Sequence, residues 1–155
     1  MRIRPMEAAD VRVLAEGLAA VPLMIRYGRD AAALARALEA ALARGEGLLV
    51  AEDDGILRGV AWFLPSGTLA LGGYLKLIAL LRGGEGKGTG AALLRAFEHE
   101  TARASAHAFL LVSDFNEGAQ RFYEREGYQR VGALPGLVLP DVAEVLYWKR
   151  LRPPD

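Results

Sequence analysis

The chain contains no cysteine, three lysines, two histidines and a single asparagine among its 155 residues. Without cysteine it can form neither a disulfide nor a thiolate metal site, and no export signal is recognisable, so we expect a cytoplasmic protein. No apolar run reaches the roughly 18 residues that a membrane-spanning helix needs, so we expect no membrane partner. Nineteen basic and nineteen acidic side chains cancel, so the net charge gives no reason to expect nucleic acid as a partner.

The scarcity of histidine limits the chemistry further. His99 lies in a charged helical stretch, and His107 precedes an expected strand. Neither belongs to a metal-ligand set or to a Ser-His-Asp arrangement that the sequence can support. We therefore expect both histidines to be structural, and we expect no metal ion.

Length and hydropathy pattern predict one domain, residues 1–155, of mixed structure. Apolar residues recur at helical spacing after Asp10 and after Asp30, which we interpret as helix N-caps, while Asp53-Asp54-Gly55 is typical of a hairpin turn. The order βααβββαβαββ predicts an α+β (α/β) fold with helices packed on one mostly antiparallel sheet. The expected helices are 10–20, 30–45, 90–103 and 116–126, and the expected strands after the first are 48–51, 58–64, 69–80, 108–113, 128–131 and 142–149.

A glycine-dense segment, Gly83 to Gly90, joins an expected strand directly to an expected helix. Glycine permits positive φ and leaves the amides open to a ligand, while a helix start presents unpaired N–H groups. Such a turn suits phosphate oxygens, although it can also serve only as a connection. It is not a P-loop, because Gly88 follows Lys87, and it is not a dinucleotide fingerprint, because it lies in mid-chain after a hairpin.

The only asparagine opens a second informative segment, Asn116 to Tyr128. Asparagine is a preferred helix N-cap and glycine is typical of a helix end, so Asn116 and Gly127 predict a short helix between them. Tyr123 lies seven residues after Asn116. Two helical turns therefore place an amide and a phenol on nearly the same face, separated by roughly 10 Å of rise. That face can hold a ligand.

The two segments together resemble the GCN5-related N-acetyltransferase (GNAT) family, and the resemblance covers most of the chain in element order. It implies a three-layer fold with a splayed, mostly antiparallel sheet of about seven strands, helices on both faces, and acetyl-coenzyme A between the fourth and fifth strands. Gly86-Lys87-Gly88-Thr89-Gly90 is similar to the family's pyrophosphate-binding motif, and Asn116, Ala119, Phe122, Tyr123, Gly127 and Tyr128 match its second motif, Asn-x-x-Ala-x-x-Phe-Tyr followed by Gly-Phe.

The resemblance also implies roles for individual residues. The pantetheine arm would pair with the backbone of the fourth strand, and the diphosphate would rest on the amides of the glycine turn. Tyr123 would protonate the departing thiolate, and Asn116 would bind the cofactor arm. The residues thereby assigned to cofactor binding are Ile78, Ala79, Leu80, Glu85, Gly86, Lys87, Gly88, Thr89, Gly90, Ala91, Asn116, Ala119, Phe122 and Tyr123.

One position departs from the family pattern. Glu85 stands where the family has glutamine or arginine. A carboxylate facing a diphosphate is repulsive, but a solvated one costs at most about 1 kcal/mol, and this position often contributes mainly its backbone N–H. Arg82 or Lys87 could also offset the charge.

The general base is the least determined part of the prediction. A primary amine with a pKa near 10.4 is only about one part in 10³ neutral at pH 7, so a side chain or a water should remove its proton. Asp114, which follows an expected strand, is our first candidate. Glu52, Tyr74 and Glu144 are weaker candidates, and a solvated or capping role is the ordinary alternative for each.

Two segments are expected to shape specificity: the connector Pro22 to Arg29 and the apolar loop Gly132 to Pro140. The loop should be covered; it could line the acceptor pocket, bury into the domain, or meet a second subunit, which gives the hypothesis of a homodimer. The predicted function is transfer of an acetyl group from acetyl-coenzyme A to a primary amine on a small molecule or peptide, by direct attack in a ternary complex. The alternatives are a non-catalytic acyl-coenzyme A binding or sensing module and a structural interaction domain.

Overall fold

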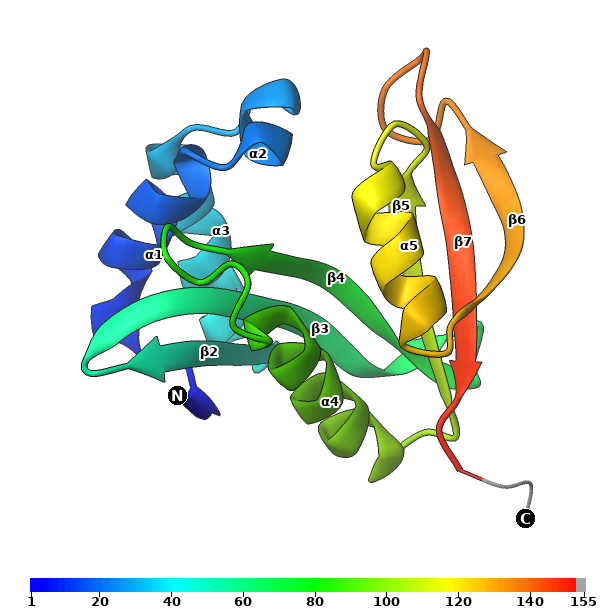
Figure 1. Ribbon diagram of the computed structural model, residues 1–155, viewed down its shortest axis with the longest axis horizontal. Coiled ribbons are helices and arrows are strands. Elements are labelled where there is room, and N and C mark those ends of the chain that lie inside the picture. The colour runs from blue at the N-terminus through cyan, green and yellow to red at the C-terminus, as the bar shows by residue number, and fades with distance from the viewer. Residues whose placement is uncertain (153–155) are drawn as a thin grey trace. The chain divides into compact units, whose positions relative to one another are not determined.

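A computed structural model describes residues 1–152 of the chain (Figure 1). Its seven strands form one sheet in the order β1-β2-β3-β4-β5-β7-β6. The pairs β1–β2, β2–β3, β5–β7 and β6–β7 are antiparallel, whereas β4–β5 is parallel. The predicted α+β fold with a mostly antiparallel sheet is therefore confirmed. The elements are β1 (Arg2–Pro5), η1 (Ala8–Asp10), α1 (Val11–Ala19), α2 (Pro22–Arg26), α3 (Ala31–Ala43), β2 (Gly47–Asp53), β3 (Ile56–Thr68), β4 (Gly72–Leu80), α4 (Thr89–Ala102), β5 (His107–Ser113), α5 (Glu117–Arg125), β6 (Gln129–Pro135) and β7 (Ala143–Arg150).

The chain divides into two compact units. The first unit consists of Met1–Phe63 and Leu77–Phe97, and the second consists of Leu64–Lys76 and the chain from Glu98 onward. Strands β3 and β4 and helix α4 each contribute residues to both units.

The first unit is built on the packing of α1 against α3 and of both helices against the sheet. The predicted helical spacing is confirmed, because Leu14 and Leu18 of α1 and Leu38 of α3 are fully buried, as are Val50 of β2 and Val60 of β3. Complete burial of such a side chain contributes on the order of 2 kcal/mol. This core includes Ala79 and Leu81, so it also packs against the end of β4 from which the glycine turn leaves.

The second unit places β7 between β5 and β6 and packs α5 on one face of these strands. The Tyr147 hydroxyl of β7 donates to Glu124 Oε1 of α5 at 2.9 Å, and the Lys149 ammonium donates to the Glu126 carbonyl at 2.8 Å. The parallel pairing of β4 with β5 runs only from Gly72 to Leu75, although β4 continues to Leu80. The last residues of β4 are thus not paired with β5.

Three expectations about local structure were wrong. The connector 21–29 contains a short helix, α2, which Pro22 starts; proline tolerates the first helical position because its missing N–H would have no partner there. Residues 69–71 form a turn before β4, in which Leu69 and Ala70 have positive φ. Strand β6 extends to Pro135, because residues 132–135 of the expected loop pair with β7.

The caps behave differently from one another. Asp30 caps α3 as predicted, accepting from the Ala33 amide at 2.7 Å. Asp10 does not cap α1, because its carboxylate accepts from the Glu7 amide at 2.8 Å and pairs with Arg4 at 2.7 Å. The predicted hairpin turn is confirmed by positive φ at both Asp54 and Gly55.

Candidate functional site

The turn after β4 is shaped by glycines that adopt conformations other residues avoid. Gly83, Gly86 and Gly88 have φ values of 79°, 71° and 73°. The Leu81 amide donates to the Arg58 carbonyl at 2.9 Å, and the Gly84 amide donates to the Leu81 carbonyl at 2.9 Å. The beginning of the turn is therefore hydrogen-bonded to β3, whereas its end takes its shape from the positive φ of Gly86 and Gly88.

The backbone amides from Glu85 to Ala91 have no main-chain acceptor of normal hydrogen-bond geometry within residues 1–152. The first helical hydrogen bond of α4 runs from the Ala92 amide to the Gly88 carbonyl at 3.0 Å. A Cβ built on Gly86 or on Gly88 meets no atom within 4 Å, so the space before these amides is open. Unpaired amides at the N-terminus of a 14-residue helix form a cradle that fits a diphosphate.

The Glu85 side chain makes a hydrogen bond within the glycine turn. Its Oε2 accepts a hydrogen bond from the Gly83 amide at 2.9 Å, so the carboxylate bends back onto its own turn. Among the described residues it forms no ion pair with Arg82 or Lys87. The main-chain amide of Glu85 remains available for a ligand.

The other cofactor residues expected in the first unit lie around this turn. Ala79 is buried, whereas Ile78 and Leu80 are half-buried at the end of β4. Thr89, the first residue of α4, is 1% exposed, and its hydroxyl has no hydrogen-bond partner among residues 1–152. Ile78–Leu80 thus form the end of β4, and Glu85–Ala91 form the start of α4 and the turn before it.

In the second unit, Asn116 caps α5 as predicted. Its Oδ1 accepts from the Ala119 amide at 3.2 Å, which leaves the two side-chain N–H groups of Asn116 without a partner in the described part of the chain. Phe122 is half-buried and packs edge-to-face against Tyr123, with ring centroids 5.0 Å apart. A capped, short helix therefore fixes Asn116 and Tyr123 relative to each other.

Tyr123 is 8% exposed, and its ring also contacts the Tyr128 ring edge-to-face at 5.8 Å. Burial raises the pKa of the Tyr123 phenol well above its ordinary value. The hydroxyl makes no hydrogen bond to another described residue. The phenol therefore stays protonated across the physiological range, which is the form that can donate a proton.

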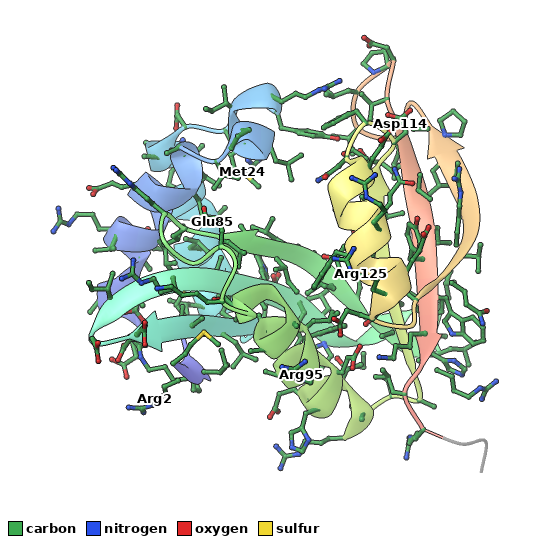
Figure 2. All side chains as sticks on the ribbon, viewed as in Figure 1. Arg2, Met24, Glu85, Arg95, Asp114 and Arg125 are labelled. Atoms are coloured by element: carbon green, nitrogen blue, oxygen red, sulfur yellow. The ribbon has the colours of Figure 1, made fainter. Side chains whose placement is uncertain are left out.

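Asp114 lies where β5 leads into α5 (Figure 2). Its Oδ2 accepts from the Ala143 amide at 3.1 Å, its own amide donates to the Ala143 carbonyl at 2.8 Å, and its carbonyl accepts from Gln120 Nε2 at 3.0 Å. These contacts extend the β5–β7 ladder by one residue and hold the start of α5. The exposed carboxylate of Asp114 therefore has a structural role, because it binds the Ala143 amide of β7.

A buried acidic residue that sequence reasoning ranked low is more closely enclosed. Glu144 is 5% exposed and lies directly opposite Ser113 in the β5–β7 register. Only the strand register reveals this pair, because 31 residues separate its members in the chain. Alternation along each strand was visible in the sequence, but the pairing between strands was not.

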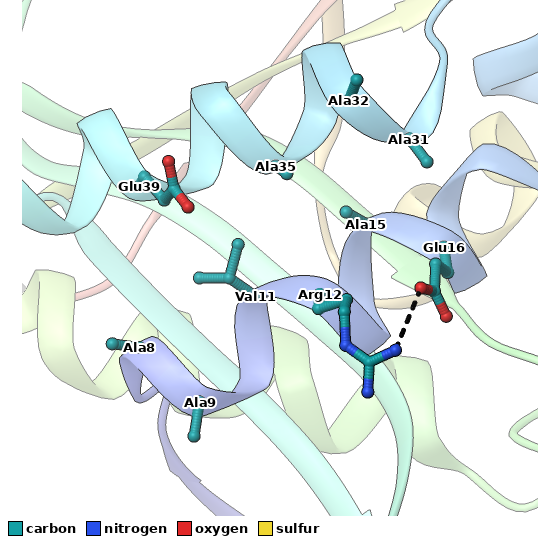
Figure 3. A pocket seen from close by; sticks show the side chains of 10 residues that line it. All are labelled: Ala8, Ala9, Val11, Arg12, Ala15, Glu16, Ala31, Ala32, Ala35 and Glu39. Atoms are coloured by element: carbon teal, nitrogen blue, oxygen red, sulfur yellow. Dashed lines mark ion pairs between the residues drawn. The ribbon is translucent and has the colours of Figure 1, made fainter.

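A groove of about 450 Å³ lies elsewhere, between η1, α1 and α3 (Figure 3). Its walls are mostly alanine, and its charged rim includes the Arg12–Glu16 ion pair of 3.5 Å. The groove contains no converging polar groups and none of the predicted site residues. Small side chains on two packed helices are sufficient to explain it.

Within residues 1–152, no helix is both long and apolar enough to span a membrane, and no three His, Cys, Asp or Glu side chains gather in a way that could hold a metal ion. The Trp148 indole donates to His107 Nδ1 at 3.0 Å, which gives this histidine a structural partner.

Comparison with known proteins identifies the family. The acetyltransferase (GNAT) domain matches residues 44–130, which include β2 to α5 and both motifs. The chain therefore belongs to the GNAT family of acetyltransferases. A search of curated proteins finds no match.

Solved structures share the fold over the whole chain. An aminoglycoside 6'-N-acetyltransferase complexed with coenzyme A is 20% identical, with 100% of both chains covered and a TM-score of 0.79. The putative acetyltransferase yncA from Salmonella typhimurium, solved with acetyl-coenzyme A, is 17% identical, with 100% of this chain and 96% of that chain covered and a TM-score of 0.77. A ribosomal-protein-alanine N-acetyltransferase from Brucella melitensis is 19% identical, with 97% and 99% covered and a TM-score of 0.73.

Proposed function

We propose that this protein transfers the acetyl group of acetyl-coenzyme A to a primary amine by direct attack, with donor and acceptor bound together. The observation that carries the proposal is the row of amides from Glu85 to Ala91 that have no main-chain acceptor within residues 1–152, with open space beside Gly86 and Gly88, on a chain of the GNAT family. The similar structures include an aminoglycoside N-acetyltransferase and a ribosomal-protein-alanine N-acetyltransferase, so they favour an amine acceptor without selecting one.

In this proposal the amides of the glycine turn hold the diphosphate. Positive φ at Gly86 and Gly88 turns successive N–H groups toward one region, and the absence of Cβ atoms lets phosphate oxygens approach. The start of α4 adds its partial positive charge. The backbone of Ile78, Ala79 and Leu80 would pair with the pantetheine arm, and the free N–H groups of Asn116 would donate to it.

Tyr123 is the proposed general acid. Breaking the carbon–sulfur bond leaves a thiolate, and a neutral phenol close to it can supply the proton. The raised pKa of Tyr123 keeps this phenol protonated, while its enclosure between Phe122 and Tyr128 fixes its direction. The protein would therefore assist departure of the thiol rather than form a covalent acyl-enzyme intermediate.

The experiment is a thiol-release assay with a panel of primary amines, together with calorimetric binding of acetyl-coenzyme A. Gly88→Ala should raise the Kd of acetyl-coenzyme A about tenfold, the equivalent of about 1.4 kcal/mol, because its Cβ would stand in the cradle. Gly45→Ala is the matched control: this residue also has positive φ, at 69°, and open surroundings, but it follows the C-cap of α3. Both variants carry the same backbone strain, so equal losses of binding would contradict the cradle.

Tyr123→Phe separates catalysis from binding in the same assay. Loss of the acid should lower turnover about 10²-fold and leave the Kd of acetyl-coenzyme A unchanged. Unchanged turnover would remove the acid role from this residue. Tight binding with no thiol release for any amine would instead favour a non-catalytic acyl-coenzyme A sensor.

A homodimer and a cytoplasmic location also remain parts of the proposal. Leu134, Leu137 and Val138 are 42%, 54% and 57% exposed, so the apolar segment at the end of β6 is not buried within its own unit. Contiguous exposed apolar side chains favour a contact with another surface. A monomer mass that does not change with concentration, measured by light scattering, would count against the dimer.

A further inference from the structure

The side chains of β7 alternate between the two faces of the second unit's sheet. Tyr147 and Lys149 face α5, because they donate to Glu124 and to the Glu126 carbonyl. Glu144 is three residues from Tyr147, so its side chain lies on the opposite face. The proposed acid belongs to α5, and this carboxylate therefore lies on the far side of the strands that α5 covers.

Ser113 and Tyr74 share that face with Glu144. The Ser113 hydroxyl of β5 donates to Oε1 and Oε2 of Glu144 at 3.2 Å and 3.3 Å, so a single proton is shared between the two oxygens. Tyr74 of β4 pairs in register with Phe109, which lies four residues before Ser113 and so has the same orientation. Burial raises the pKa of Tyr74, and the negative charge of Glu144 raises it further.

The neighbourhood makes a carboxylate an unusual choice for packing alone. Leu111 and Leu146 occupy the adjacent paired positions on this face, and both are half-buried. A buried carboxylate must recover its lost hydration through hydrogen bonds or a cation, whereas a leucine would not.

We propose that Glu144 binds the ammonium group of the acceptor and removes its proton, with Ser113 positioning the carboxylate and Tyr74 completing the polar end of the acceptor site. This inference rests on the proposed function and deepens it. The chemical class it selects is a primary ammonium carried on an apolar stem, because three N–H donors suit carboxylate and phenol oxygens while Leu111 and Leu146 suit the carbon chain.

The proton and bond changes balance as follows. One ammonium proton passes to Glu144, directly or through water, and leaves to solvent as the net proton released. The freed nitrogen lone pair forms the bond to the acetyl carbon, the carbon–sulfur bond breaks, and Tyr123 gives its proton to sulfur. The second nitrogen proton, lost as the amide forms, restores Tyr123 through solvent. The products are an acetamide, a thiol and one proton.

The test is Glu144→Gln, which preserves the shape of the side chain and an oxygen for Ser113. We expect kcat/KM for a primary alkylamine to fall by about 10² to 10³-fold, with the Kd of acetyl-coenzyme A unchanged. Glu124→Gln is the matched control, because Glu124 also accepts a hydroxyl proton but on the α5 face, and it should retain full activity. Equal kcat/KM in Glu144→Gln and the wild type would overturn the inference.

A second readout separates proton removal from a merely structural effect. With a weakly basic amine that is already neutral at the assay pH, Glu144→Gln should lose far less activity than with the alkylamine, because no proton must be removed before attack. An equal loss with both amines would contradict the base role. Should Glu144→Gln fail to fold, Ser113→Ala decides: a raised KM for the alkylamine, restored by Ser113→Thr, supports the positioning, and an unchanged KM overturns it.

The outcome for the wild type keeps the two proposals apart. If the wild-type protein releases no thiol with any amine, the proposed function fails before the variants are compared. If the wild type is active and the Glu144 and Ser113 variants match it, the function stands and only the acceptor site proposed here is wrong.

Discussion

At the scale of single residues, the tyrosines differ by what encloses them. Burial raises the pKa of Tyr123, and burial together with the Glu98 carboxylate raises that of Tyr128. Tyr147 is fully buried, and burial together with its hydrogen bond to Glu124 raises its pKa to about 12. All three phenols therefore remain neutral in the folded protein at pH values where an unfolded chain would begin to lose their protons.

This enclosure predicts a loss of stability at alkaline pH. Below pH 10 the folded and unfolded states both keep the phenolic protons, so the free energy of unfolding does not depend on pH through these tyrosines. Above about pH 10 the unfolded chain binds fewer protons than the folded one, so the free energy of unfolding falls as pH rises, by up to about 1.4 kcal/mol per pH unit for each tyrosine. Urea unfolding at pH values from 8 to 11 measures this slope.

Tyr147→Phe tests the assignment, since Tyr147 lies outside the proposed catalytic groups. The variant should be less stable than the wild type at pH 8, because it lacks the hydrogen bond to Glu124. It should then lose less stability between pH 10 and 11, because it lacks the phenol whose pKa is raised in the folded state. Identical slopes for variant and wild type would show that Tyr147 ionises normally in the fold.

At the scale of elements, the glycine turn depends on one close approach as well as on positive φ. A Cβ on Gly84 would lie 2.2 Å from the Arg58 carbonyl oxygen of β3, and that oxygen also accepts from the Leu81 amide. Because the obstacle is backbone, it cannot rotate away. The position of the turn is thus set by its contact with β3.

Gly84→Ala should therefore destabilise the protein by about 1 to 3 kcal/mol and weaken acetyl-coenzyme A binding as the turn shifts. Gly118→Ala is the opposite case, because Gly118 lies in α5, lacks positive φ, and has no atom within 4 Å of a built Cβ. It should raise stability by about 0.5 to 1 kcal/mol. Thermal unfolding of both variants checks these signs, and a neutral Gly84→Ala would show that the turn can move freely.

At the scale of the whole molecule, short-range signals could be predicted from the sequence. The Asp30 and Asn116 caps bond to amides three residues away, and the Asp54-Gly55 turn needs only its own backbone conformations. The motif residues likewise fall at the predicted ends of β4, α4 and α5. Each of these features depends on neighbours in the chain, which is why periodicity and residue type were enough.

Features that depend on distant residues could not be predicted in this way. Aspartate is a common helix N-cap, but the carboxylate of Asp10 pairs with Arg4 and therefore does not cap α1. Arg4 also pairs with Glu52 of the neighbouring strand. The Ser113–Glu144 pair exists only because β7 aligns with β5 in one register. The predicted single domain remains a prediction, since the two compact units are each defined by their own contacts.

The central claim is that main-chain amides between Glu85 and Ala91 hold the diphosphate, and nuclear magnetic resonance of ¹⁵N-labelled protein tests it most directly. Coenzyme A should shift the amide signals of Gly86, Gly88 and Gly90 strongly downfield, because each would gain a charge-assisted hydrogen bond. Pantetheine, which lacks the diphosphate, should leave these three signals in place. Saturating coenzyme A that moves other amides but not these glycines would contradict the account.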